Sequence, residues 1–110
     1  MVLFLAFDQE INLHGISLAK YNLNNSFFNT LNINLSPDLR FFCEGIAEVN
    51  NMYYTYGHFD DLSPTVRVKG FIKKWNNDFS EELSNWTFGH DEVVTISDLR
   101  FSKENTAVFT

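Results

Sequence analysis

Apolar and polar side chains alternate along much of this chain, and a period of two residues is typical of β-strands. In 31–36, three aliphatic residues alternate with two asparagines and a serine, so one face of this strand should be buried and the other solvated. In 65–75, valines and an isoleucine alternate with arginine and lysines, which predicts a second strand whose polar face is basic.

Other segments carry weaker signals. Residues 2–7 are apolar at both phases, which indicates a strand that is covered on two faces. In 11–21, apolar residues flank Gly15, a candidate for a bulge or a bend. Residues 92–101 and 106–109 enclose a polar turn and predict a terminal hairpin. Residues 78–86 fit either a single helical turn or a structured loop, and the pattern does not decide between them.

Two structures compete for the stretch that follows Ser36. The sequence Ser-Pro-Asp at 36–38 resembles the start of a helix, and apolar residues recur at helical spacing as far as Ile46. The alternative is a hairpin of 40–49 and 52–61 that turns at two asparagines. We favour the hairpin, because Gly45 would cost a helix about 1 kcal/mol relative to alanine.

The hairpin makes a definite prediction about which side chains share a face. One face should hold alternate residues of both arms, namely Cys43, Gly45, Ala47, Val49, Met52, Tyr54, Tyr56 and His58. The other face should place Glu44 and Glu48 beside Tyr53 and Thr55, as an acidic strip.

Seven or eight short strands with closely spaced turns predict an all-β fold, either an antiparallel β-sandwich or a partly open barrel. An α+β fold with a helix at 37–49 is the alternative. Because 110 residues is the usual size of one domain, we expect a single domain over 1–110.

The charge balance narrows the functional classes. Fourteen acidic and eight basic residues give a formal charge of -6, opposite in sign to that of nucleic-acid-binding proteins, so direct DNA or RNA binding is not expected. The apolar start of the chain lacks the basic residues of a secretory signal, and no apolar run reaches the roughly 20 residues of a membrane span. We therefore expect a cytoplasmic protein.

No complete catalytic motif is present, and we expect neither an enzyme nor a bound cofactor or metal. Cys43 is the single cysteine, which excludes an internal disulfide, and we expect a buried, inert thiol. The segments 56–61 and 88–92 both read aromatic, glycine, histidine and then acids. A metal-dependent hydrolase could use such residues, which are His58, Asp60, His90 and Asp91. Two short segments do not establish that these ligands converge, so polar loops are the simpler interpretation.

Acidic and aromatic residues together suggest a surface for a cationic protein. Three acidic doublets fall in predicted loops or at strand ends, and tyrosines and tryptophans lie near them in sequence. Carboxylates accelerate encounter with a basic partner, and buried rings anchor it. Each doublet could equally serve solubility, and each ring could belong to the core. The candidate partner-binding residues are Glu44, Glu48, Tyr53, Asp60, Asp61, Trp75, Glu81, Glu82, Trp86, Asp91 and Glu92.

In general character the chain resembles the immunity proteins that bacteria pair with contact-dependent growth inhibition toxins and with nuclease bacteriocins. The resemblance rests on a small, acidic chain rich in asparagine and aromatic residues, since these proteins share no motif. It implies a non-catalytic inhibitor that binds one cognate basic toxin domain, typically a ribonuclease, in a one-to-one complex. Its carboxylates would occupy the phosphate positions of the toxin cleft. A carbohydrate-binding β-sandwich module, with exposed tryptophan and tyrosine, is the alternative.

Overall fold

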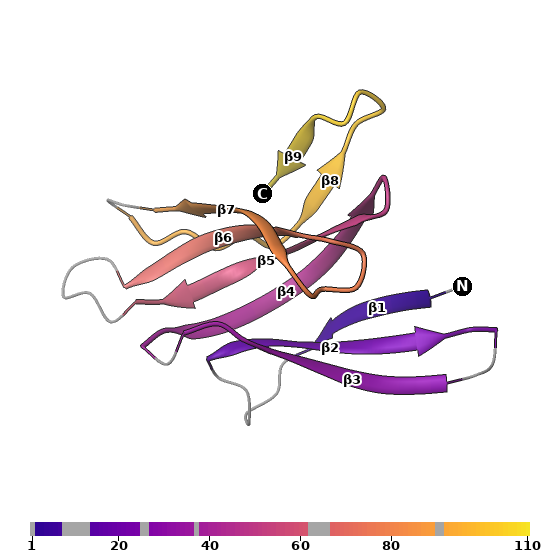
Figure 1. Cartoon of the computed structure of the whole chain (residues 1–110). Coiled ribbons are helices and arrows are strands. Elements are labelled where there is room, and N and C mark those ends of the chain that lie inside the picture. The colour runs from indigo at the N-terminus through magenta and orange to yellow at the C-terminus, as the bar shows by residue number, and fades with distance from the viewer. Residues whose placement is uncertain (1, 8–13, 25–26, 37, 62–66, 90–91) are drawn as a thin grey trace.

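The computed structural model describes residues 2–7, 14–24, 27–36, 38–61, 67–89 and 92–110. In this part of the chain there are nine strands in three antiparallel sheets, each with its strands in sequence order (Figure 1). The first sheet contains β1 (Val2–Phe7), β2 (Gly15–Asn22) and β3 (Phe27–Asn34). The second contains β4 (Arg40–Val49), β5 (Met52–Asp60), β6 (Val68–Trp75) and β7 (Glu82–Phe88). The third is a hairpin of β8 (Leu99–Phe101) and β9 (Ala107–Phe109).

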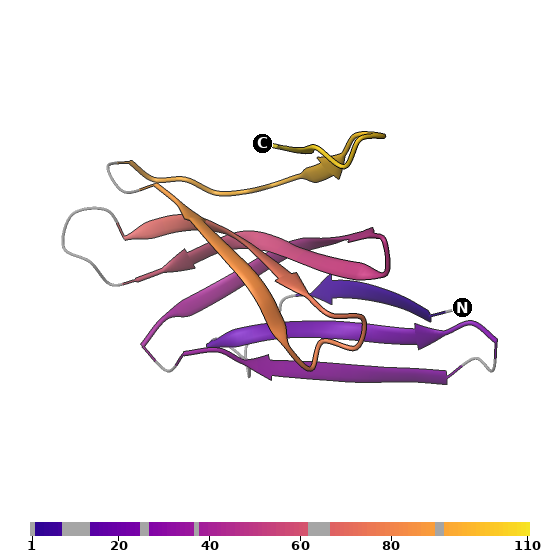
Figure 2. The same cartoon turned by 45° about the horizontal axis from the view of Figure 1, so that its top comes forward.

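The prediction of an all-β fold is confirmed. The described residues contain no helix, and β4 occupies most of 37–49, so the alternative helix there is wrong. The three sheets stack as layers, with the four-stranded sheet in the middle (Figure 2). This arrangement fits a β-sandwich and is not a closed barrel. No helix long and apolar enough to span a membrane occurs among the described residues.

The face of the four-stranded sheet that packs on the first sheet is here called the core face. Its aromatic residues enclose Ile16 and Leu18 of β2, both fully buried, and Phe71 of β6 is fully buried as well. The Phe41 and Phe59 rings stack with their centroids 5.4 Å apart. Burying each of these side chains contributes about 2 kcal/mol, so this interface is the main hydrophobic core.

The opposite face of the four-stranded sheet, here called the hairpin face, is covered by the chain after β7. The Val94 N–H donates to the Val68 carbonyl at 3.3 Å, and the Ile96 N–H donates to the Gly57 carbonyl at 3.2 Å. Ile96 is buried above Gly70, where an added Cβ would lie 2.9 Å from the isoleucine side chain. Gly70 therefore lets the C-terminal layer approach the sheet closely.

The predicted hairpin is confirmed, with a refinement at its far end. Asn50 and Asn51 form the turn with φ values of 52° and 66°, which asparagine tolerates better than most residues. From Gly45 onward the strands pair as predicted, but a β-bulge between Cys43 and Gly45 shifts the register. Cys43 therefore packs against the core-face cluster, and the prediction that it shares a face with Gly45 is wrong.

Other boundaries differ from the expected ones. Residues 82–88 form strand β7, whereas the sequence indicated only a turn or loop over 78–86. The terminal hairpin is confirmed, but it begins at Leu99, because residues 93–98 have no regular structure. The strand expected at 65–75 is β6 from Val68 onward, and 62–66 lie outside the described residues.

Candidate functional site

The loop between β6 and β7 is fixed by an aromatic anchor. Phe79 is buried and stacks on Tyr53, with the ring centroids 5.0 Å apart. It adopts a φ of 62°, which turns its ring back into the core. The Asn76 side chain holds the two ends of the loop, since its amide donates to the Ser80 hydroxyl at 2.8 Å and its oxygen accepts from the Glu81 N–H at 3.1 Å.

This anchored loop gathers carboxylates at one end of the four-stranded sheet. Asp78 and Glu81 lie in the loop and Glu82 begins β7, while Glu48 of β4 pairs in register with Tyr53, on which the loop packs. We call these four residues the acidic end. The sequence predicted Glu48, Glu81 and Glu82 as partner-binding residues but missed Asp78.

Two groups in or beside the acidic end, Tyr53 and Asp78, have shifted pKa values. Burial, and then the Glu48 carboxylate, raise the pKa of Tyr53 above its usual value. Hydrogen bonds from Ser80 lower the pKa of the exposed Asp78, and the charge of Lys20 on β2 adds to this effect. Glu48 therefore acts on a tyrosine of β5, and Asp78 is acted on by Ser80 of its own loop and by Lys20 of the first sheet.

A buried lysine lies behind the acidic end. The Lys73 ammonium donates to a Glu82 carboxylate oxygen at 2.6 Å and to the Asn85 side-chain oxygen at 3.3 Å. It also lies 5.9 Å from the centroid of the Phe41 ring. Lys73 is 7% exposed, so its charge is held inside the protein while Glu82 remains partly open to solvent.

The predicted doublet Asp60-Asp61 lies at the opposite end of the same sheet. Asp60 lies seven positions after Tyr53 along β5, which corresponds to about 23 Å of extended strand. Asp60 forms an ion pair with Arg67 at 3.4 Å, and Asp61 accepts a hydrogen bond from Lys69. Both carboxylates are therefore paired with cations of the protein itself.

Glu44 is separated from Glu48 by the β-bulge. Its carboxylate lies 3.6 Å from the Nδ1 atom of His58, whose ring stacks on Phe42. The prediction that Glu44 and Glu48 form one strip beside Tyr53 is therefore wrong, because the bulge turns Glu44 toward His58.

The three aromatic candidates have different environments. Tyr53 is 8% exposed and Trp75 is 3% exposed, so both belong to the core. The Trp75 indole N–H donates to the Thr55 hydroxyl at 2.9 Å, which satisfies its polar group inside the protein. Trp86 on β7 is 45% exposed and lies at the surface.

The remaining candidates are distributed elsewhere. Glu92 is exposed, near the end of the sheet that carries Asp60, while His90 and Asp91 lie outside the described residues. In the described part of the chain, no three His, Cys, Asp or Glu side chains are grouped so that they could hold a metal ion. Burial raises the pKa of the Cys43 thiol to about 12, and such a thiol is unreactive at neutral pH.

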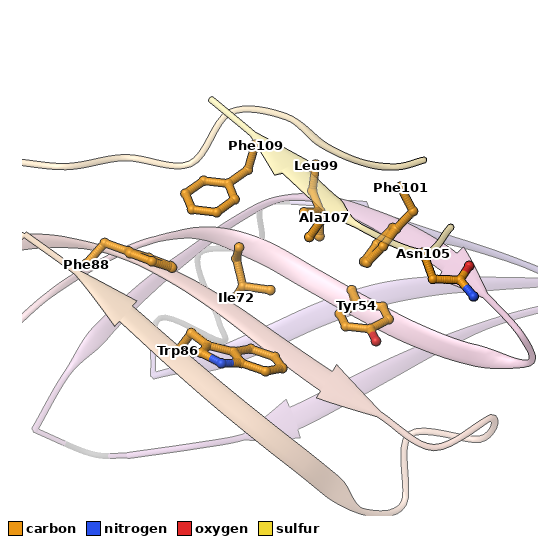
Figure 3. A pocket seen from close by; sticks show the side chains of 9 residues that line it. All are labelled: Tyr54, Ile72, Trp86, Phe88, Leu99, Phe101, Asn105, Ala107 and Phe109. Atoms are coloured by element: carbon orange, nitrogen blue, oxygen red, sulfur yellow. The ribbon is translucent and has the colours of Figure 1, made fainter. Parts of the chain in front are cut away.

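An aromatic groove lies between the terminal hairpin and the hairpin face. Phe101 of β8 packs on Tyr54 of β5 with ring centroids 4.7 Å apart, and Phe109 of β9 packs on Phe88 of β7 at 4.9 Å. Between these two aromatic pairs is a groove of about 460 Å³, with Ile72 on its floor and Trp86 at its β7 side (Figure 3). The sequence did not reveal this groove, because it depends on how residues 99–109 pack on strands that lie far from them in the chain.

Comparison with protein-family models, with curated proteins and with solved structures gives no match to this chain.

Proposed function

We propose that this chain is a non-catalytic immunity protein that binds and neutralises a basic toxin domain, with a ribonuclease as the expected class of toxin. The observation that carries the proposal is the acidic end, where four carboxylates lie in or beside a loop that the Phe79 ring anchors on Tyr53. Its charge suits the phosphate-binding cleft of a nuclease, which is lined with cations.

Trp86 offers an exposed apolar contact on the same edge strand as Glu82. It lies on β7, four residues after Glu82, and almost half of its surface is open to solvent. Exposed tryptophan is enriched among the residues that dominate binding energy at protein interfaces, and a charged rim accelerates the encounter. Strand β7 is at the edge of its sheet, so a partner can approach it from the side.

The test uses the product of the coding sequence immediately upstream, because the resemblance to immunity proteins implies a neighbouring toxin gene. The C-terminal domain of that product is purified and mixed with this chain. We expect that domain to be basic, to cleave RNA, to form a one-to-one complex by light scattering and to lose its activity in the complex.

Trp86→Ala should weaken this complex by about a hundredfold, as for a tryptophan at the centre of an interface. Leu23→Ala is the matched control, because Leu23 is 55% exposed in the turn that follows β2, and its truncation should leave the affinity unchanged. An upstream product without a basic domain, or a basic domain that neither binds nor is inhibited, would overturn the proposal.

A further inference from the structure

The groove under the terminal hairpin has the size of a small-molecule site. Its volume of about 460 Å³ falls in the range of roughly 300 to 1,000 Å³ that is usual for ligand pockets. An apolar cavity of roughly 150 Å³ already holds a benzene molecule. The groove is therefore large enough for two or three fused rings.

The two ends of the groove differ in chemistry. At one end, Phe88 and Phe109 form an apolar wall, while at the other Asn105 and the Tyr54 hydroxyl provide the polar groups (Figure 3). The Asn105 backbone N–H donates to the Ser102 carbonyl at 2.9 Å, which fixes the turn that carries its side chain. Neither the Asn105 amide nor the Tyr54 hydroxyl has a hydrogen-bond partner among the described residues, so each is available to a polar group of a ligand.

The charges around the groove favour a neutral ligand. No charged side chain is among the described residues that line it, so a buried charge would lack a partner there. The net charge of -6 disfavours an anion, and the Lys74 ammonium, 5.9 Å from the centroid of the Tyr54 ring, disfavours a cation at the polar end. A sugar, with a hydroxyl on most of its ring carbons, would leave most of those groups unpaired against aromatic walls.

We infer that the groove binds a small, neutral, flat aromatic molecule of two or three rings that carries one hydroxyl or amide group. Its rings lie over Ile72, between the two aromatic pairs, and its polar group meets Asn105. The groove shares Trp86 with the proposed partner surface, but none of the four residues of the acidic end lines it, and the inference does not depend on the proposed function.

The test is a titration with 2-naphthol, followed by NMR at the indole N–H signals of the two tryptophans. Trp86 lines the groove, whereas Trp75 lies on the core face, where its N–H is bonded to Thr55. The Trp86 signal should shift and saturate while the Trp75 signal stays in place. If neither signal moves, or both move equally, the inference is overturned.

Two variants locate the ligand. Ala107→Phe fills the groove and should weaken 2-naphthol binding at least about tenfold, while Val108→Phe, at the neighbouring 61% exposed position outside the groove, should leave it unchanged. An unchanged Trp75 signal shows that each variant is folded. Equal affinity in both variants would contradict the inference.

Asn105→Gly provides a second, milder test. Asn105 has a φ of 62°, which glycine accepts without strain, so this variant removes the amide and keeps the turn. Binding of 2-naphthol should weaken about fivefold, which is the effect of one hydrogen bond, whereas naphthalene binding should not change. An unchanged affinity for 2-naphthol would remove the assigned role of Asn105.

A ligand series tests the predicted chemistry. 2-Naphthoate and protonated 2-naphthylmethylamine should each bind at least about tenfold more weakly than 2-naphthol, because no charged side chain lines the groove in the described part of the chain and a buried charge would lose its hydration there. Cellobiose should not shift the Trp86 signal. Equal binding of a charged analogue, or a saturable response to cellobiose in place of 2-naphthol, would overturn the assignment of a neutral aromatic ligand.

Discussion

The two ends of the four-stranded sheet carry similar numbers of carboxylates but use them differently. At one end, Asp60 and Asp61 face Arg67 and Lys69, and their side chains are 23% and 19% exposed. At the other, the loop acids Asp78 and Glu81 are exposed on an anchored turn. A carboxylate doublet in the sequence therefore does not indicate a binding surface until it is known whether lysines or arginines of the same protein pair with it.

The difference follows from the neighbouring strand. At the Asp60 end, Arg67 just before β6 and Lys69 on β6 each form an ion pair with one of the two aspartates. At the acidic end, Lys73 of β6 bonds Glu82, while the β6 residue that pairs with Tyr53 is Trp75, which belongs to the core. The loop acids Asp78 and Glu81 are exposed to solvent, which leaves their charge available to a partner.

Lys69→Met should have the largest effect on stability. Lys69 and Asp61 are both mostly buried, so the variant leaves a carboxylate with neither its ammonium nor full hydration. We expect the free energy of unfolding to fall by about 2 kcal/mol, measured by urea denaturation. Lys103→Met, in an exposed turn, is the control and should cost little. A loss as small as that of the control would mean that Asp61 does not depend on Lys69.

Lys73→Met should cost less, about 1 kcal/mol or below. Methionine fills most of the same volume, and Glu82 can remain hydrated because its side chain is 35% exposed. The variant also removes a positive charge from behind the acidic end, so it should accelerate association with a basic domain. Slower association, measured by stopped flow, would contradict the role given to this end of the sheet.

Arg67→Ala should have a smaller effect, below about 0.5 kcal/mol. Its side chain is 55% exposed, and ion pairs of exposed side chains contribute little. Urea denaturation of Arg67→Ala and of Lys69→Met compares the two losses in the free energy of unfolding directly. A loss as large as that of Lys69→Met would show that burial does not rank the two pairs.

Much of the fold follows from the period of two in the sequence, and the exceptions have physical causes. The strand that carries Leu31 and Ile33 is confirmed as part of β3, which ends at Asn34, because these two side chains are partly buried and the asparagines that alternate with them are exposed. Strand β7 was missed because it is an edge strand with exposed residues on both faces, including Leu83 and Trp86, and so shows no clean alternation.

The candidate site was less predictable than the fold. The bulge at Cys43 separates Glu44 from Glu48, and a single extra residue of this kind leaves no mark in the alternation. The exposure of Trp86 and the burial of Trp75 depend on which layer covers each face of the sheet. The spacing of residues along the sequence therefore predicts neither the exposure of Trp86 nor the burial of Trp75.

The pH dependence at the acidic end gives the smallest expected effect. The raised pKa of Tyr53 means that the fold favours the neutral phenol, so this contribution is complete below about pH 10 and is lost as the pH rises above it. Glu48→Gln removes the second cause of the raised pKa.

The loss of stability between about pH 9 and about pH 11 should therefore be a few tenths of a kcal/mol smaller in Glu48→Gln than in the unmodified chain. Urea denaturation at both pH values measures it. Cys43 and Tyr56, whose pKa values are also raised, contribute equally in both proteins and cancel. Glu92→Gln is the control and should keep the full loss.

The central claim, that the acidic end receives a basic partner, is tested most directly by two double variants of equal charge. Glu48→Lys with Glu81→Lys alters the acidic end, and Asp38→Lys with Glu92→Lys alters the other end; each pair of reversals raises the net charge from -6 to -2. Association with the upstream-encoded basic domain is measured by stopped flow at low and high salt. The first variant should associate about tenfold more slowly at low salt and the second by less than about twofold, with the difference fading at high salt. Equal slowing of association in both variants, or no slowing in either, would contradict the account.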